Sequence, residues 1–458
     1  MSETLTSVGI DVGTTSTQLV VSELTIENRA SSFAVPEMEI ASREILYRSP
    51  VHFTPLLEGN LVDGDKIRAI VEHEYKNAGI SQADVDTGAV IITGETSRRE
   101  NARAVLSALS EYAGEFVVAT AGPALESILA ARGAGAVAHS KATGQRVFHM
   151  DIGGGTSNLA LIENGSICCT DCLNVGGRLI KVDKSGKILY LSPVLQGLCT
   201  FGVGDRVTPA ALEPVAQTLV QALEMAAGLR QPTDLLTRLR TAELGTHHGC
   251  AVENATISFS GGVADCIETD HEPFAFGDMG PILGKAIRKS RLCQGSYRLG
   301  AETIRATVIG AGCHSAQLSG STVFCQNLSL PLKNRPVVAL NLEEQALPEQ
   351  ELTACIRRKL AQQDTLSVLA LPGLNAPAYE RIEALAAAIA NAMDAPLLVA
   401  VEQDMAKALG QAIALRRPPG DGILCIDRVR LTAEDYLDVG KPIGPALPVV
   451  VKTLILER

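Results

Sequence analysis

Two short glycine-rich stretches hold the residues best suited to phosphate chemistry. In each, a carboxylate is followed by glycines and threonines: Asp11 by Gly13, Thr14 and Thr15, and Asp151 by Gly153, Gly154, Gly155 and Thr156. Glycine has no Cβ, so its backbone N–H groups can approach a phosphate closely. Mg²⁺ prefers one or two carboxylates together with water and phosphate oxygens. Each stretch therefore supplies both parts of a site for a phosphate chain and its cation.

The two stretches occur in the same local pattern, 140 positions apart (151 minus 11). An apolar, strand-like run precedes each turn, and a second strand-like run follows it. After the second turn, Asn164-Gly165 separates two further strand-like runs, which is a strong hairpin signal. We therefore expect a duplicated antiparallel unit, whose two turns could hold one phosphate chain from both sides.

A third glycine pair, Gly261-Gly262 in SFSGGVAD, follows another strand-like run. A single Asp–Gly turn would be read as a plain β-turn, but two matched turns and this pair favour a nucleotide. A Walker loop needs GxxxxGK[ST] at the start of a helix, and the turns carry no such lysine. A dinucleotide fingerprint needs GxGxxG before a helix, whereas strands follow these turns.

The composition of the chain limits its partners. It has 458 residues, 3% aromatic residues without tryptophan, and a formal net charge of −11. Few aromatic rings disfavour a stacking surface for nucleic acid, and the negative charge disfavours binding to phosphate backbones or anionic membranes. No apolar run reaches the ~18 residues of a membrane span, and the N-terminus does not resemble a signal peptide. We expect a cytoplasmic protein.

The 11 cysteines do not form a disulfide pattern and fit reduced thiols of a cytosolic protein. Cys168, Cys169 and Cys172 form one cluster, but no fourth metal ligand stands at a recognisable spacing, so we interpret them as small strand residues. His247, His248 and Cys250 are interpreted as part of a polar loop. Neither they nor His314 are assigned as ligands.

Periodicity predicts the elements that position the turns. Helices are expected over 63–80 with a stop at Gly79, over 97–114, from Pro123 onward, and in much of 208–240. Strands are expected near 88–94 and 116–122, a strand followed by a turn over 251–265, and small-residue strands and turns over 305–324. After about residue 336 strands and helices alternate, which indicates a separate α/β domain.

The motifs together resemble the superfamily of actin, sugar kinases and heat-shock chaperone ATPases. IDVGTTST resembles its first phosphate motif, DIGGGTSN its second, SFSGGVAD its adenosine motif, and ATAGPALESILAARG and GDMGPILGKAI its connecting helices. The resemblance implies an α/β protein with a two-lobed actin-like ATPase fold, built from duplicated ribonuclease-H-like lobes that close over Mg²⁺ and ATP. Asp11 and Asp151 would be the catalytic, metal-holding carboxylates. The turn residues, with Gly261 and Gly262, would bind ATP.

Two positions depart from the chaperones. Asn158 stands where they have an acid, and Gly122 stands where they have a glutamate that orients the attacking water. Glu95 could substitute, although an acid at a helix start is an equally good interpretation of it. With these positioning groups altered, we expect slow ATP hydrolysis and a switch rather than a metabolic kinase.

Over nearly its full length the chain resembles the ethanolamine ammonia-lyase reactivating factor family, on stretches such as AVIITGETSRRENAR, LNVGGRLI, VEQDMAKALGQAI and DYLDVGKPIGPALPVVVKTL. The resemblance implies a chaperone that uses ATP and Mg²⁺ to exchange damaged cobalamin on the lyase for adenosylcobalamin. We expect lobe I at about 1–145, lobe II at about 146–300, and a C-terminal α/β domain at 301–458 as the candidate lyase-contacting surface.

Three other functions stay open on the same fold. They are a small-molecule kinase, an ATP-driven activator of another enzyme through an iron–sulfur cluster, and a filament-forming actin relative. A place in an ethanolamine-utilising bacterial microcompartment also stays open.

Overall fold

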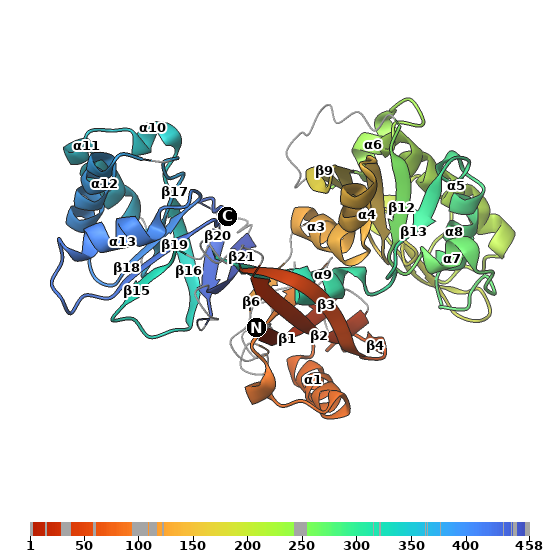
Figure 1. Ribbon diagram of the computed structural model, residues 1–458. Helices are drawn as coiled ribbons and strands as arrows, with labels where there is room; N and C mark the ends of the chain where they lie inside the picture. Colours follow the sequence, from red (N-terminus) through yellow and green to blue (C-terminus); the bar gives the residue numbers. More distant parts are fainter. Residues whose placement is uncertain are drawn as a thin grey trace.

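The computed structural model describes residues 3–13, 16–28, 38–57, 61–93, 109, 117–120, 123–241, 254–314, 316–319, 322–361, 363, 365–375, 377–433, 435–440, 442 and 447–453. Three sheet-based units follow one another along the chain (Figure 1). Among the described helices, none has the length and apolarity needed to cross a membrane. The helix expected over 97–114 lies outside the described residues, apart from Leu109.

The first unit, lobe I, is a sheet with strand order β3-β2-β1-β5-β6, and β4 pairs with β2. Its strands are β1 (Glu3–Val12), β2 (Ser16–Asn28), β3 (Met38–Arg48), β4 (His52–Phe53), β5 (Thr87–Ile92) and β6 (Val117–Thr120). Helix α1 (Gly64–Ala78) covers one face, where its apolar residues pack against alternate residues of β1. It begins after Asp63, whose carboxylate caps the Lys66 N–H, and ends at Gly79 with φ 70°, as predicted.

The second unit, lobe II, repeats this topology as β9-β8-β7-β12-β13. Its strands are β7 (Val147–Ile152), β8 (Ser157–Glu163), β9 (Ser166–Leu173), β12 (Thr256–Ser260) and β13 (Tyr297–Leu299), and β10 (Ile180–Val182) pairs with β11 (Ile188–Leu191). The predicted hairpin between β8 and β9 is confirmed, since Asn164 and Gly165 have φ values of 50° and 77°. The duplicated meander predicted from the sequence is therefore present.

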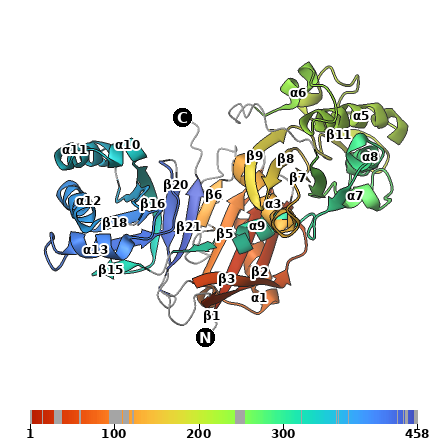
Figure 2. The same ribbon diagram turned by 45° about the horizontal axis from the view of Figure 1, so that its top comes forward.

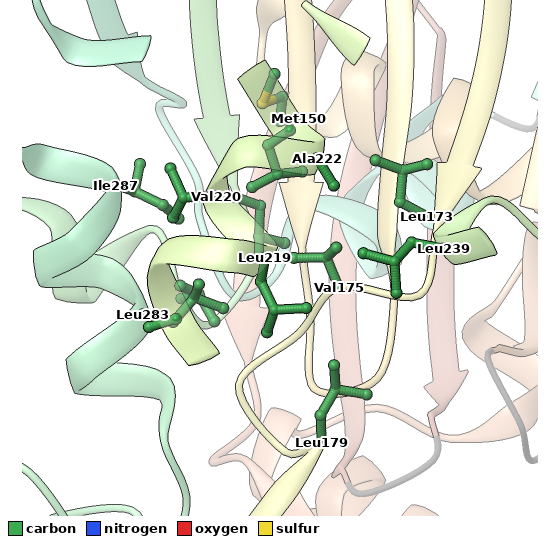
Figure 3. Packing of buried hydrophobic residues seen from close by; sticks show 14 of the residues in the cluster. Met150, Leu173, Val175, Leu179, Leu219, Val220, Ala222, Leu239, Leu283 and Ile287 are labelled. Carbon is green, nitrogen blue, oxygen red and sulfur yellow. The ribbon is translucent and has the colours of Figure 1, made fainter. Parts of the chain in front are cut away.

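Helices cover the outer face of the lobe II sheet. They are α5 (Pro209–Ala226), α6 (Asp234–Leu239), α7 (Asp265–Glu268) and α8 (Gly280–Arg288). Met150 of β7 and Val175 pack with Leu219 and Val220 of α5 and Leu283 of α8 in one apolar core (Figure 3). The alternate residues of β7, which include Asp151, face the other side of the sheet.

Two helices carry the chain between the lobes and lie in the middle of both views (Figures 1 and 2). Helix α3 (Pro123–Gly133) leads through α4 (Ala136–Thr143) into lobe II, and α9 (Ala306–His314) leads back to the sheet of lobe I. They cross at glycines. A Cβ on Gly133 would lie 1.8 Å from the Ala306 carbonyl oxygen, and one on Gly310 would lie 2.0 Å from that of Leu129. Only glycine permits this approach.

Helix α9 corrects the first part of the prediction of strands and turns over 305–324, whereas strands at 316–318 and from 324 onward agree with it. Its small residues, which suggested turns, are required because α3 and β1 approach its backbone closely; a Cβ on Gly9 of β1 would lie 2.5 Å from the Val308 carbonyl oxygen. The domain boundary at residue 300 stays a prediction. However, α9 follows that boundary in sequence and packs on the lobe I sheet, which favours an end of the two-lobed region after about residue 314.

The third unit is an eight-stranded sheet with order β14-β21-β20-β16-β17-β18-β19-β15. Its strands are β14 (Ala316–Leu318), β15 (Phe324–Gln326), β16 (Leu332–Ala339), β17 (Val368–Leu371), β18 (Leu397–Val401), β19 (Ile423–Asp427), β20 (Asp435–Val439) and β21 (Pro448–Thr453). Its helices are α10 (Leu342–Gln345), α11 (Glu349–Leu360), α12 (Tyr379–Ala392) and α13 (Ala406–Ala414). The predicted alternation of strands and helices is confirmed. Figure 2 shows β20 and β21 beside lobe I.

Candidate functional site

The two predicted phosphate turns are closed by the same backbone hydrogen bond. In lobe I the Gly13 N–H donates to the Ser16 carbonyl oxygen at 2.9 Å, and in lobe II the Gly153 N–H donates to that of Thr156 at 2.9 Å. Asp11 lies opposite Gln18 across the first hairpin, and Asp151 lies opposite Asn158 across the second. The turns are therefore matched in hydrogen bonding and in register, as their sequences predicted.

Asp11 lies at the end of β1 and accepts a hydrogen bond from the Thr93 hydroxyl at 2.8 Å. The pKa of Asp11 is raised to about 7, chiefly by burial and also by the nearby charges of Glu126 and Asp151, against the lowering effect of the Thr93 hydrogen bond. The interaction with Asp151 brings the two predicted carboxylates into one electrostatic site, although 140 positions separate them in the chain (151 minus 11).

Asp151 lies at the matching position of β7 and is 7% exposed. Burial raises its pKa to about 6, against hydrogen bonds from the Ser260 and Thr307 hydroxyls. Ser260 belongs to β12 and Thr307 to α9, so lobe II and the returning helix both position this carboxylate. Asp11 is partly buried and Asp151 is buried, and both have raised pKa values. In the absence of ligand, the site therefore carries more negative charge than its surroundings favour.

Glu126 is a third carboxylate that the sequence analysis did not select. It lies in the first turn of α3, is 6% exposed, and accepts a hydrogen bond from the Asn158 side-chain amide at 2.9 Å. The charge of Glu126 acts on Asp11, while its partner Asn158 lies opposite Asp151. Its sequence signal was the acid after Pro123 in PALES, which resembles any acid near a helix start.

The amides that face the two aspartates each have a buried oxygen that accepts no hydrogen bond from the described residues. Gln18 Nε2 donates to the Ile304 carbonyl oxygen at 3.2 Å and Asn158 Nδ2 donates to Glu126, which leaves Gln18 Oε1 and Asn158 Oδ1 as these oxygens. Buried acceptors of this kind are unfavourable unless a donor or a cation reaches them. Carboxylate and amide oxygens are the donor set of a hydrated Mg²⁺ site, so these residues fit that ion.

The glycines of the second turn leave space on one side and are enclosed on the other. A Cβ on Gly155 would meet nothing within 4 Å, whereas one on Gly154 would lie 3.3 Å from the Arg178 side chain. The Arg178 N–H donates to the Gly154 carbonyl oxygen at 2.6 Å, so the segment after β9 supports the turn from behind. The open side at Gly155 suits a phosphate group.

The third glycine pair lies directly behind the second turn. Gly261 has φ 86°, and a Cβ on it would lie 2.3 Å from the Ile152 carbonyl oxygen. That oxygen also accepts the Val263 N–H at 3.1 Å. Gly262 has ordinary space, with Ile304 nearest at 3.7 Å. Gly261 is thus required for contact with β7, and the role of the pair in binding ATP stays a prediction.

The described part of the chain excludes the predicted ATP-binding residues Thr14 and Thr15, the positions Glu95 and Gly122, and the unassigned His247, His248 and Cys250. Cys168, Cys169 and Cys172 lie on β9 and are exposed, half-buried and buried. Within the described ranges, no group of three or more His, Cys, Asp or Glu side chains could hold a metal ion.

Two sheets of the same strand order, joined by a pair of crossing helices and bearing matched carboxylate turns, define the actin-like ATPase fold, here with an additional C-terminal sheet domain. The chain belongs to the family of ethanolamine utilisation protein EutA, whose model matches residues 3–457. It is 40% identical to the ethanolamine ammonia-lyase reactivase EutA of Salmonella typhimurium and 38% identical to that of Escherichia coli, each over 98% of both chains. The expected family is confirmed.

Solved structures that match cover about two thirds of the chain. A Ppx/GppA family member of Aquifex aeolicus is 15% identical with a TM-score of 0.42, over 67% of this chain and 97% of that one. The ethanolamine utilization protein EutJ of Carboxydothermus hydrogenoformans is 18% identical with a TM-score of 0.36, over 67% and 88%. These scores are low, and the fold assignment rests on the topology described above.

Proposed function

We propose that this protein is an ATP-dependent reactivase of ethanolamine ammonia-lyase, which promotes exchange of damaged cobalamin on the lyase for intact adenosylcobalamin. The observation that supports this partner is 38–40% identity, over 98% of the chain, to two proteins named as reactivases of that enzyme. The nucleotide is supported by the two matched turns, whose carboxylates lie close enough for one to raise the pKa of the other.

In this proposal the chain's own groups divide the binding of Mg²⁺ and ATP between the lobes. Asp11 and Asp151 hold the cation directly or through water, and the N–H groups of Gly154 and Gly155 contact phosphate oxygens. The Gly13 and Gly153 N–H groups close the turns, and these two glycines let the phosphate chain approach the backbone. Thr14, Thr15 and Thr156 add hydroxyl donors, and Gly261 and Gly262 lie toward the adenosine. The bound cation supplies charge neutralisation for the phosphate chain.

Glu126 is the group best placed to orient a water for hydrolysis. Its carboxylate is buried and held by Asn158, and its charge reaches Asp11. An ionised carboxylate accepts two or more hydrogen bonds and can fix the direction of a water proton. Because an amide occupies position 158, one acidic contact is missing, and we keep the expectation of slow hydrolysis suited to a switch.

Nucleotide state would act on the lyase through closure of the lobes about α3 and α9. A nucleotide shifts such an equilibrium only by the difference in its affinity for the open and closed forms. Each tenfold change in lyase affinity between nucleotide states requires about 1.4 kcal/mol of differential contact.

The C-terminal sheet domain is our candidate for the lyase-contacting surface. Three large apolar side chains are exposed on its helical side: Leu342 of α10, Tyr379 of α12 and Leu415 after α13. Leu342→Ser combined with Leu415→Ser should weaken capture of purified lyase and leave ATP affinity unchanged. The matched control, Val203→Ser in lobe II, also removes an exposed apolar side chain. If the double variant and the Val203→Ser control captured the lyase equally well, the assignment of this surface would be refuted.

The direct test uses lyase inactivated with a cobalamin that lacks its adenosyl group. The lyase is incubated with this protein, ATP, Mg²⁺ and adenosylcobalamin, and ammonia release is followed with and without each component. We expect activity to return only with nucleotide and cation present. Phosphorylation of a small molecule, or sedimentable polymer, without recovery would support the kinase or filament alternatives instead.

A further inference from the structure

The aspartates of the two turns differ in the side chains behind them. On the face of β7 that bears Asp151, His149 precedes it by two residues, and on the parallel strand β12 Ser258 and Ser260 occupy the partner positions. His149, Ser258 and Ser260 are each 0% exposed. Four polar side chains thus form a square on one face of two adjacent strands.

Hydrogen bonds join this square into one chain. Ser258 Oγ lies 3.2 Å from His149 Nδ1, His149 Nε2 lies 3.0 Å from Ser260 Oγ, and Ser260 Oγ donates to Asp151 Oδ1. A hydroxyl has one proton, so Ser260 can donate to the carboxylate only if it accepts from the ring. The ring nitrogen that faces Ser260 is therefore Nε2–H, and Nδ1 accepts the proton of Ser258.

Lobe I shows that the fold does not require this series of hydrogen bonds. The corresponding parallel pairs there are Gly9 with Ala89 and Asp11 with Ile91, so glycine, alanine and isoleucine stand where lobe II has His149, Ser258 and Ser260. Both sheets have the same strand order. A buried polar square in one lobe and apolar residues in the other indicate a role for the square beyond packing.

We infer that His149 is a positioning residue for Asp151: through Ser260 it fixes the carboxylate so that its remaining lone pairs are directed at the cation. This inference rests on the proposed function, in which Asp151 holds Mg²⁺. Side chains that hold a metal ligand by hydrogen bonds determine its orientation, and their loss commonly weakens metal binding 10–100-fold. Asp11 accepts a hydrogen bond from Thr93 in the corresponding role.

The test compares ATP affinity by calorimetry with Mg²⁺ and with EDTA, and takes the ratio of the two affinities. For His149→Leu and Ser260→Ala we expect this ratio to fall about tenfold or more, with affinity in EDTA unchanged. His149→Gln restores an N–H toward Ser260 and should stay within about threefold of the wild type. Ser140→Ala, a buried hydroxyl of α4 in the same lobe, is the matched control.

A second readout does not depend on ligand. Nitrogen-15 NMR of the wild-type protein should show His149 as the Nε2–H tautomer, and Ser260→Ala should change the shift of that nitrogen. If His149→Leu does not fold, Ser260→Ala carries the affinity test, because serine to alanine leaves the strand packing intact.

The outcomes separate the inference from the function on which it rests. Wild-type protein whose ATP affinity does not respond to Mg²⁺ would overturn the proposed site, and the inference with it. A magnesium-responsive wild type together with an unchanged ratio in His149→Leu and Ser260→Ala, or an Nδ1–H tautomer, would overturn the inference alone.

Discussion

The turns of lobe I and lobe II are closed by the same hydrogen bond but differ in the side chains that support their carboxylates. Each closes with a glycine N–H bonded to the carbonyl three residues later, at 2.9 Å. Behind Asp11, however, stand Gly9, Ala89 and Ile91, whereas behind Asp151 stand His149, Ser258 and Ser260. A backbone shape can be duplicated while the side chains around it acquire separate tasks.

The difference follows from where the two central helices pack. Helix α9 lies so close to β1 that only glycine fits at position 9, with Gly312 N 2.8 Å from a Cβ placed there. At the matching site in β7 there is room for an imidazole. In lobe I, helix α9 therefore packs directly against the backbone of β1 at Gly9. In lobe II, the matching position of β7 holds the hydrogen-bonded side chain of His149.

The largest expected effect tests whether both carboxylates belong to one site. Asp11→Asn and Asp151→Asn should each lower magnesium-dependent ATP hydrolysis and lyase reactivation by about 100-fold or more, since each removes a charge facing the cation. Single-turnover hydrolysis is the measurement. If one variant kept wild-type rates, the turns would not act together on one nucleotide.

A slightly smaller effect is expected at Glu126, which belongs to neither turn. Glu126→Gln should reduce hydrolysis about 100-fold while ATP affinity changes little, because the carboxylate acts on water rather than on the nucleotide. Glu224→Gln, a buried glutamate bonded to Arg230 in lobe II, is the matched control. Equal losses in rate and affinity would contradict a role in orienting water.

Substitutions at two glycines distinguish a residue that contacts the ligand from one that the fold requires. Gly155→Ala adds a methyl to open space, so we expect an unchanged melting temperature and ATP affinity about tenfold weaker, or ~1.4 kcal/mol. Gly261→Ala should lower the melting temperature, because its φ of 86° and its contact with Ile152 exclude a side chain. Thermal unfolding without ligand, followed by calorimetry, distinguishes them, and the reverse pattern would show that their roles are exchanged.

The smallest effect is in the pH dependence of ligand-free stability. The pKa values of Asp11 and Asp151 in the folded state, about 7 and about 6, lie above the ordinary value of 3.8. Between these values the folded protein binds more protons than the unfolded chain, so the contribution of both groups to stability falls as pH rises from about 4 to about 7. Across this pH window, the melting temperature of the double variant Asp11→Asn, Asp151→Asn should decline less than that of the wild type. Parallel declines would argue against these shifts.

Sequence patterns were most informative where local chemistry is strong. Gly79, Asn164-Gly165 and Pro123 mark element ends through backbone preferences that act within a few residues, and the structure confirms all three. The pattern was misleading over 306–314, where α9 is helical despite its glycines, since the packing partners that require those glycines are distant in sequence. Glu126 was missed for the same reason: its position beside Asn158 depends on how α3 lies against β8.

By itself, the sequence determined the family, the duplicated strand–turn–strand units and the carboxylates and glycines of both turns, because these depend on residue identity and short spacing. Only the tertiary structure decided which side chains meet across the lobes. It brought Glu126 near Asp11, oriented Asp151 through Ser260 and His149, and returned α9 to the first sheet. These contacts join residues up to 305 positions apart, as between Ser7 of β1 and Gly312 of α9, and such pairings are set by the packing of sheets and helices rather than by local preference.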